Sequence, residues 1–212
     1  MLTIKSFEFS PIQENTYILY NEFNDCIIID PGCYSDAEKE EMVAFITANK
    51  LTPKMLINTH CHLDHVFGNK FIAEKYNLKL QLHENEKAVL AFAPTSGLMY
   101  SMAFDNYVGD LIVLNEGDKI SLGKDVLDVL LVPGHSPGSL AFYCSEDKFV
   151  ISGDALFKNS VGRSDLPGGN HDQLIKSIKE NLLALPEETL VYSGHGAVTE
   201  IGVERRNNPY LN

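Results

Sequence analysis

Three of the seven histidines of this chain fall within six consecutive positions, together with an aspartate. They are His60, His62, Asp64 and His65, in the stretch THCHLDH (59–65). No regular element brings these four side chains together, because a strand turns His65 away from the others and a helix divides them between two faces. A loop can bring them together, and converging imidazole and carboxylate groups are typical ligands of divalent metals. The cluster therefore predicts a metal site.

Three further residues with metal-binding side chains follow apolar runs. His135 comes after LDVLLVPG, Asp154 after KFVISG and His195 after TLVYSG, and His60 itself follows KMLINT. Because α/β proteins build their sites in loops at the carboxyl ends of core strands, we expect these positions to lie close together.

Counted with the cluster, the candidates are five histidines and two aspartates. One tetrahedral zinc uses three or four ligands, so seven donors predict two ions that share a carboxylate. Nitrogen and oxygen donors suit Zn(II), Fe(II) or Mn(II).

Neighbouring residues have plainer interpretations. His83 and His171 are isolated and read as hydrogen-bonded or solvated side chains. Asp64 could cap a helix that begins near His65 as well as bind a metal. Cys61 would point away from the position shared by His60 and His62 in an extended stretch, so we interpret it as a small buried apolar residue.

The segments that must position these side chains alternate between strand and helix patterns. Strands are expected in LTIKSFEF, NTYILY and CIIID, at 55–58 and 79–83, in LIVLNEGDKISLG and DVLDVLLVPG, in the hairpin SLAFYCSEDKFVISG and at 189–193. Helices are expected from Ser35 or Asp36 to about Asn49, from Phe67 to Tyr76, over about 84–92, from about Asp172 to Leu185 and near 199–206. Residues 93–110 have no clean period and predict either a long loop acting as a lid or substrate wall, or a short irregular helix on the core.

The bulk composition narrows the class of protein. A chain of 212 residues and 23.6 kDa predicts one domain, 1–212, with ordinary hydrophobic (44%) and charged (22%) contents. A formal charge of −12 argues against nucleic acid as a partner. No secretory leader and no apolar stretch of membrane-spanning length is evident. The four cysteines show no paired spacing, which favours a cytoplasmic protein without membrane attachment.

In its ordered motifs the chain resembles the metallo-β-lactamase superfamily, and within it the glyoxalase II-like thioesterases. The motifs are DPG (30–32), THCHLDH (59–65), PGHSPGS (133–139), SGDALF (152–157) and SGHG (193–196). The resemblance implies an α/β fold, the αββα sandwich, with the site at one edge. It also implies a ligand set: His60, His62 and His135 for a first metal, Asp64, His65 and His195 for a second, Asp154 as the bridge, and Asp30 as a buried supporting acid.

Two features locate the chain within that family. Glyoxalase II enzymes carry a C-terminal helical domain that supplies much of the glutathione site, whereas this chain ends soon after His195. It therefore resembles the short, single-domain subgroup without that helical domain. The stretch GRSD (162–165) resembles one shared by this subgroup and the persulfide dioxygenases. Arg163 could bind a substrate carboxylate such as that of glutathione, or pair with Asp165 at the surface.

The resemblance implies hydrolysis of a thioester, S-lactoylglutathione or a related acylthiol. A hydroxide that bridges two divalent ions would attack the carbonyl, and Asp64 would orient it as the catalytic residue. Two alternatives use the same scaffold: oxidation of a glutathione persulfide by O₂ at a single iron, and hydrolysis of a lactone. The oligomeric state is left open.

Overall fold

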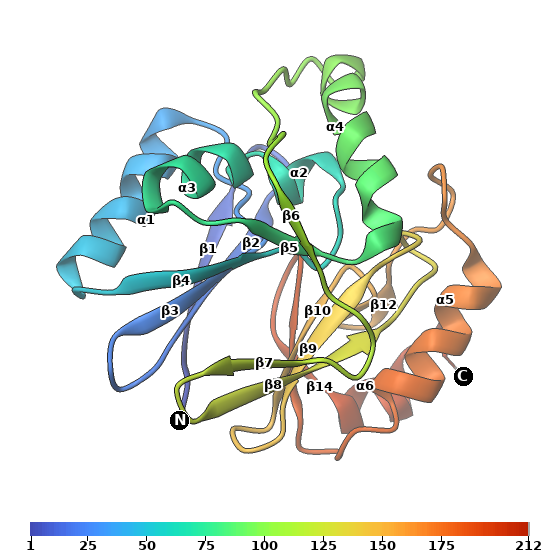
Figure 1. The fold of residues 1–212 in the computed structure, drawn as a ribbon. Coiled ribbons are helices and arrows are strands. Elements are labelled where there is room, and N and C mark those ends of the chain that lie inside the picture. The colour runs from blue at the N-terminus through green and yellow to red at the C-terminus, as the bar shows by residue number, and fades with distance from the viewer. Residues whose placement is uncertain (212) are drawn as a thin grey trace.

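The computed structural model describes residues 1–211, and Asn212, the last residue of the predicted domain, lies outside the described residues. Two six-stranded mixed sheets pack face to face, and helices cover both outer faces (Figure 1). This arrangement confirms the αββα sandwich.

The first sheet carries the N-terminal half of the chain. Its strands, in spatial order, are β1 (Thr3–Phe9), β2 (Glu14–Tyr20), β3 (Asp25–Ile29), β4 (Thr52–Ile57), β5 (Leu80–Leu82) and β6 (Leu111–Val113). The pairs from β1 to β3 are antiparallel, and those from β3 to β6 are parallel. The connections hold α1 (Asp36–Ala48), α2 (Leu63–Val66), α3 (Asn69–Tyr76), the 3₁₀ turn η1 (Glu84–Glu86) and α4 (Lys87–Met99).

The second sheet carries the C-terminal half. Its strands, in spatial order, are β14 (Thr199–Glu200), β13 (Leu190–Ser193), β10 (Phe149–Gly153), β9 (Leu140–Cys144), β8 (Asp125–Leu131) and β7 (Lys119–Leu122). Only the β10–β13 pair is parallel. Beside this sheet lie α5 (His171–Ser177), its π-helical continuation η2 (Ile178–Leu182), α6 (Ile201–Asn207) and the small hairpin of β11 (Leu156–Phe157) and β12 (Ser160–Val161).

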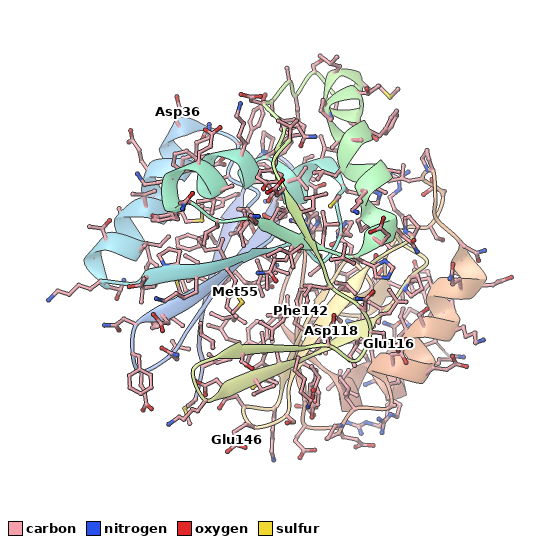
Figure 2. The ribbon with its side chains drawn as sticks, in the orientation of Figure 1. Asp36, Met55, Glu116, Asp118, Phe142 and Glu146 are labelled. Carbon is pink, nitrogen blue, oxygen red and sulfur yellow. The ribbon has the colours of Figure 1, made fainter. Side chains whose placement is uncertain are left out.

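Alternating side chains of a strand point to opposite faces of its sheet and so belong to separate apolar layers. On β3, Ile28 packs beneath the helices of the first sheet, while Ile27 and Ile29 face the second sheet. Met55 of β4 and Phe142 of β9 both belong to the layer between the sheets (Figure 2). A third layer lies between β10, β13 and the C-terminal helices. Central strands such as β2, β3, β9 and β10 are thus buried on both faces, which leaves their carboxyl ends as the positions available for a site.

Most expected elements are present, but the region 93–110 differs from the loop interpretation. Helix α4 continues through Pro94 to Met99, and only the residues after Tyr100 are irregular up to β6. Proline has no N–H to donate to the carbonyl four residues earlier, that of Leu90. The side-chain amide of Asn106 donates to that carbonyl instead, at 2.8 Å. A loop over the whole segment is therefore wrong, and the helix alternative holds for its first part.

Two smaller expectations also change. Helix α2 begins at Leu63, and no side chain caps it, so Asp64 lies within its first turn instead of capping it. The helix expected to reach Leu185 ends as the π-helical turn at Leu182. In residues 1–211 no helix has the length and apolar character needed to cross a membrane.

Candidate metal centre

All seven predicted metal-binding side chains lie at one edge of the sandwich, in the loops that follow four strands. The loop after β4 and helix α2 carry the 60–65 cluster, and the loops after β8, β10 and β13 carry one residue each. Three groups of three donors have their ligand atoms within 4.8 Å of one another, and one of these groups, Asp30 with His60 and His65, includes the expected supporting acid. The first trio is His60, His62 and His135, and the second trio is Asp64, His65 and His195.

Within the first trio, three ring nitrogens converge. Nε2 of His135 lies 2.8 Å from Nδ1 of His62 and 3.1 Å from Nε2 of His60. Within the second trio, Oδ2 of Asp64 lies 3.1 Å from Nε2 of His195 and 3.7 Å from Nε2 of His65.

Asp154 lies between the two trios. Its Oδ2 is 3.6 Å from Nε2 of His135 in the first trio and 3.6 Å from Nε2 of His195 in the second. Its Oδ1 is 3.4 Å from Nε2 of His65. One carboxylate is therefore within reach of both groups, the position expected of a bridging ligand.

Hydrogen bonds fix the tautomers of two histidines of the first trio, His135 and His60. Nδ1 of His135 donates to the carbonyl oxygen of Arg163 at 2.7 Å, so its Nε2 presents a lone pair. The hydroxyl of Thr59 donates to Asp30, so it accepts from Nδ1 of His60, whose Nε2 then also presents a lone pair. Two lone pairs 3.1 Å apart repel unless a cation lies between them.

The second trio is oriented in the same way. Nδ1 of His195 donates to the carbonyl of Gln13 at 3.0 Å, and Nδ1 of His65 donates to Asp30 at 3.1 Å. Both Nε2 lone pairs therefore face carboxylate oxygens. Nε2 of His65 and Oδ1 of Asp154 are buried without a hydrogen-bond partner. Electron pairs directed at a common point, with no donor between them, fit a pair of divalent cations.

The histidine pKa values are shifted in opposite directions in the two trios: they are lowered in the first and raised in the second. Burial lowers the pKa of His62 to about 3 and also lowers the pKa values of His60 and His135, so these rings stay neutral. Neutral imidazole is the form that binds metal.

In the second trio burial is outweighed by the neighbouring carboxylates. Burial disfavours the charged form of His65, but Asp154 and Asp64 raise its pKa well above the ordinary value. The hydrogen bond with Asp64 likewise raises the pKa of His195 against burial. Burial would also raise the pKa values of Asp64 and Asp154, yet His65 lowers both. A proton thus competes with a cation for this position.

Asp30 supports the centre without being available as a ligand. Its Oδ1 accepts from the side chain of Asn58 and the backbone N–H of Thr59, and its Oδ2 accepts from the Thr59 hydroxyl and from His65. Four donors occupy all the lone-pair positions of a carboxylate. Asp30 therefore orients His65 and Thr59, as expected of a buried supporting acid.

Glu86, which sequence reasoning did not single out, joins two of the metal-binding loops. Its buried carboxylate accepts hydrogen bonds from the backbone of Cys61, from the hydroxyl of Ser136 and from the backbone of Gly138. Cys61 separates the two histidines of the first loop, and Ser136 follows His135. No local pattern could reveal this role, since an acid on a helical turn normally indicates a solvated face.

Asn15 has a similar role at the second trio and was also missed. Its side-chain amide donates to the carbonyls of Ser193 and Gly196, and its backbone N–H donates to the carbonyl of Gly194. These bonds hold the loop that carries His195 against the start of β2.

The centre opens into a cavity of about 570 Å³, called here the metal-site cavity. Asp64, Asp154 and His195 lie in its wall, and Arg163 lies there too. The guanidinium of Arg163 forms a two-point ion pair with Asp165, with both N···O distances 2.8 Å. Arg163 therefore pairs with Asp165, as one sequence interpretation expects, and it also borders the cavity, while its binding of a substrate carboxylate stays a prediction.

The remaining histidines lie outside the centre. Nδ1 of His83 accepts the backbone N–H of Asn85 and caps η1, and His171 begins α5. Cys61 is fully buried in the core, and the four cysteines are free thiols.

Sequence comparison identifies relatives over the length of the chain. The model of the family described as "Metallo-beta-lactamase superfamily" matches residues 10–195. "Probable metallo-hydrolase YqgX" of Bacillus subtilis is 40% identical over 204 residues, covering 95% of this chain and 94% of that protein. "Hydroxyacylglutathione hydrolase GloC" of Haemophilus influenzae is 31% identical over 213 residues, covering 100% of this chain and 99% of that protein.

A solved structure has the same fold. TTHA1623, in a di-iron-bound form, superposes with a TM-score of 0.88 at 37% identity, covering 98% of this chain and all of that chain.

Proposed function

This chain belongs to the metallo-β-lactamase superfamily and is a metal-dependent hydrolase, and we propose that it cleaves thioesters, S-lactoylglutathione or a related acylthiol, with two divalent ions. The observation that carries the proposal is the pair of trios joined by Asp154, with members of both trios in the wall of an open cavity. The similarity to a hydroxyacylglutathione hydrolase supports the thioester as the substrate.

Each trio, with the shared carboxylate, supplies four donors to one ion. Zn(II), Fe(II) and Mn(II) all suit such a set of imidazoles and carboxylates, and the similarity to a di-iron-bound structure supports iron as one choice. When bound, two such cations lower the pKa of a water molecule to about 7 and polarise a carbonyl oxygen.

Asp64 is the catalytic residue of the proposal. The low pKa of its carboxyl keeps it ionised at neutral pH, and it lies in the wall of the metal-site cavity. It can therefore accept a hydrogen bond from the attacking water and orient it. His62 stays neutral because of its low pKa, so it adds no positive charge that would compete with the cations.

Arg163 is the residue we propose for binding the thiol carrier. Its pair with Asp165 uses two of the five guanidinium N–H groups, which leaves three for a substrate carboxylate. Replacing Arg163 with Gln should raise KM about tenfold for glutathione thioesters. The same change should leave KM unaltered for the thioester of a thiol without a carboxylate, such as N-acetylcysteamine.

Metal analysis and hydrolysis of S-lactoylglutathione on the same purified sample test the proposal. We expect about two metal equivalents with turnover in the wild type. His195→Ala should lose about one equivalent and most activity, while the matched control His171→Ala, outside the centre, should lose neither. Two equivalents without hydrolysis of any thioester would contradict the proposal. Oxygen consumption with a glutathione persulfide at one iron, or lactone hydrolysis alone, would establish the alternative activities instead.

A further inference from the structure

A second cavity of about 280 Å³, called here the apolar cavity, lies beside the metal-site cavity. The two share His62, Leu63, Ser96 and Leu166 in their walls. A ligand held at the first trio can therefore extend into the apolar cavity without leaving the site.

The walls of the two cavities differ in chemistry. On one side of the apolar cavity α4 presents Ala88, Val89, Phe92 and Ala93, and on the other side lie Leu166 and two prolines. No lysine, arginine, aspartate or glutamate is among its lining residues, all of which belong to the described part of the chain. Phe92 is 45% exposed, so a bound apolar group would remove its ring from water. The metal-site cavity, by contrast, contains Asp64, Asp154 and Arg163.

The difference in charge between the two cavities predicts which end of a thioester each cavity binds. Thiol carriers of the glutathione type bear carboxylate and ammonium groups, which are costly to bury among apolar side chains. The acyl group carries no such charge. We infer that the apolar cavity binds the acyl group and that the preferred substrates are thioesters with an apolar acyl chain, an inference that rests on the proposed function. An engineered cavity of about 150 Å³ holds benzene, so this larger one suits acyl groups of roughly four to eight carbons.

A series of S-acylglutathiones, from acetyl to hexanoyl with lactoyl for comparison, tests the inference on the wild type. Burial of one methylene corresponds to about a fourfold gain, so kcat/KM should rise two- to fourfold with each added carbon. A kcat/KM that stays constant or falls with chain length would overturn the inference. Failure to hydrolyse any member of the series would instead contradict the proposed function.

Two alanine-to-phenylalanine substitutions on α4 distinguish an effect of filling the apolar cavity from a general effect of a bulky residue on the helix. Ala88→Phe fills the apolar cavity and should bring the hexanoyl-to-acetyl ratio of kcat/KM close to one. Ala91 lies on the same helix but borders a different hollow, so Ala91→Phe should keep the wild-type ratio. An unchanged ratio in the Ala88 variant would overturn the inference.

Binding of uncleavable thioethers gives a readout independent of turnover. In calorimetry S-hexylglutathione should bind the metal-loaded wild type at least tenfold more tightly than S-methylglutathione, and Ala88→Phe should abolish the difference. Equal affinities in the wild type would overturn the assignment of the cavity even if thioesters are hydrolysed.

Discussion

The hydroxyl of Ser136 donates a 2.6 Å hydrogen bond to the carboxylate of Glu86, a fully buried acid 50 residues earlier in the chain. The same carboxylate accepts the backbone N–H of Cys61 and that of Gly138. It thereby ties the loop of His60 and His62 to the loop of His135. This buried group thus contributes to the distance between the two loops of the first trio, together with the backbone hydrogen bond from Leu140 to Thr59.

Glu86→Gln should weaken metal binding at the first trio. The NH₂ group of a glutamine cannot accept a hydrogen bond, so at least one of the three donors that now bind the carboxylate would lose its acceptor. An unsatisfied buried donor lowers the free energy of unfolding by about 1–3 kcal/mol. We expect a 10- to 100-fold weaker affinity for one of the two ions, measured by chelator competition. Glu84→Gln, an exposed acid of the same turn, is the matched control and should have no effect. Unchanged affinity in the Glu86 variant would show that the loops hold their positions without it.

Asp30→Asn should affect the second trio. In the wild type Nδ1 of His65 donates to Asp30, and Nε2 keeps the lone pair that faces the metal position. An asparagine NH₂ group at that carboxylate oxygen would donate to Nδ1 instead and would oppose the Thr59 hydroxyl, so the proton of His65 would move to Nε2. The expected result is a 10- to 100-fold loss of affinity for one ion with a smaller effect on the other. Stoichiometry and chelator competition measure this, with the exposed acid Asp36 replaced by Asn as the control for charge (Figure 2). Two tightly bound equivalents in Asp30→Asn would refute the role.

Gly194→Ala should disturb the centre through contact, and Gly196→Ala should not. A Cβ at Gly194 would overlap Oδ1 of Asp154 and come within 2.7 Å of Cε1 of His65. At Gly196 a Cβ would meet nothing within 4 Å, although its φ of +74° adds strain of about 1 kcal/mol. We expect a large loss of metal content in the first variant and only a lower melting temperature in the second. Equal metal content in both would contradict the contact argument.

Cys33 should make the stability of the fold fall in alkaline solution. Burial, with a contribution from Glu14, raises the pKa of this thiol from about 9 to about 12. Above pH 9 the unfolded chain loses the proton while the folded chain keeps it, so the free energy of unfolding decreases as pH rises toward 12. By pH 10 the decrease is about 1.4 kcal/mol.

Urea unfolding at pH 8 and pH 10 measures this effect. Cys33→Ala should lose about 1.4 kcal/mol less than the wild type between the two pH values, because alanine has no proton to lose. Cys26→Ala should behave similarly, since burial raises the pKa of that thiol to about 12 as well. Identical losses in wild type and variants would show that these thiols do not titrate differently on unfolding.

The positions of the metal-binding residues could be predicted because the signal is local. His60, His135, Asp154 and His195 each follow an apolar run, and the carboxyl ends of such runs meet at one edge of a layered α/β fold. The resemblance of the motifs to one superfamily then implied the αββα sandwich, which the structure confirms. The net charge and composition argued against nucleic acid as a partner, but they did not indicate the position of any site residue.

The course of α4 could not be predicted in this way. Pro94 normally ends or kinks a helix, and its sequence neighbourhood gives no reason to expect otherwise. The carbonyl of Leu90 is satisfied by Asn106, which lies beyond the helix and reaches it only in the folded chain. Beyond Pro94 the helix places Ser96 in the walls of both cavities beside the metal centre.

The sequence by itself therefore determined which side chains could bind metal and at which strand ends they lie, because strand periodicity and residue type are properties of neighbouring residues. Tertiary structure decided how they are oriented. The proton positions on His60, His65 and His195 depend on Thr59, Asp30 and Gln13. Glu86 collects donors from loops 25 to 52 residues away. Hydrogen bonds over such separations form only when the sheets pack, so no local pattern in the chain encodes them.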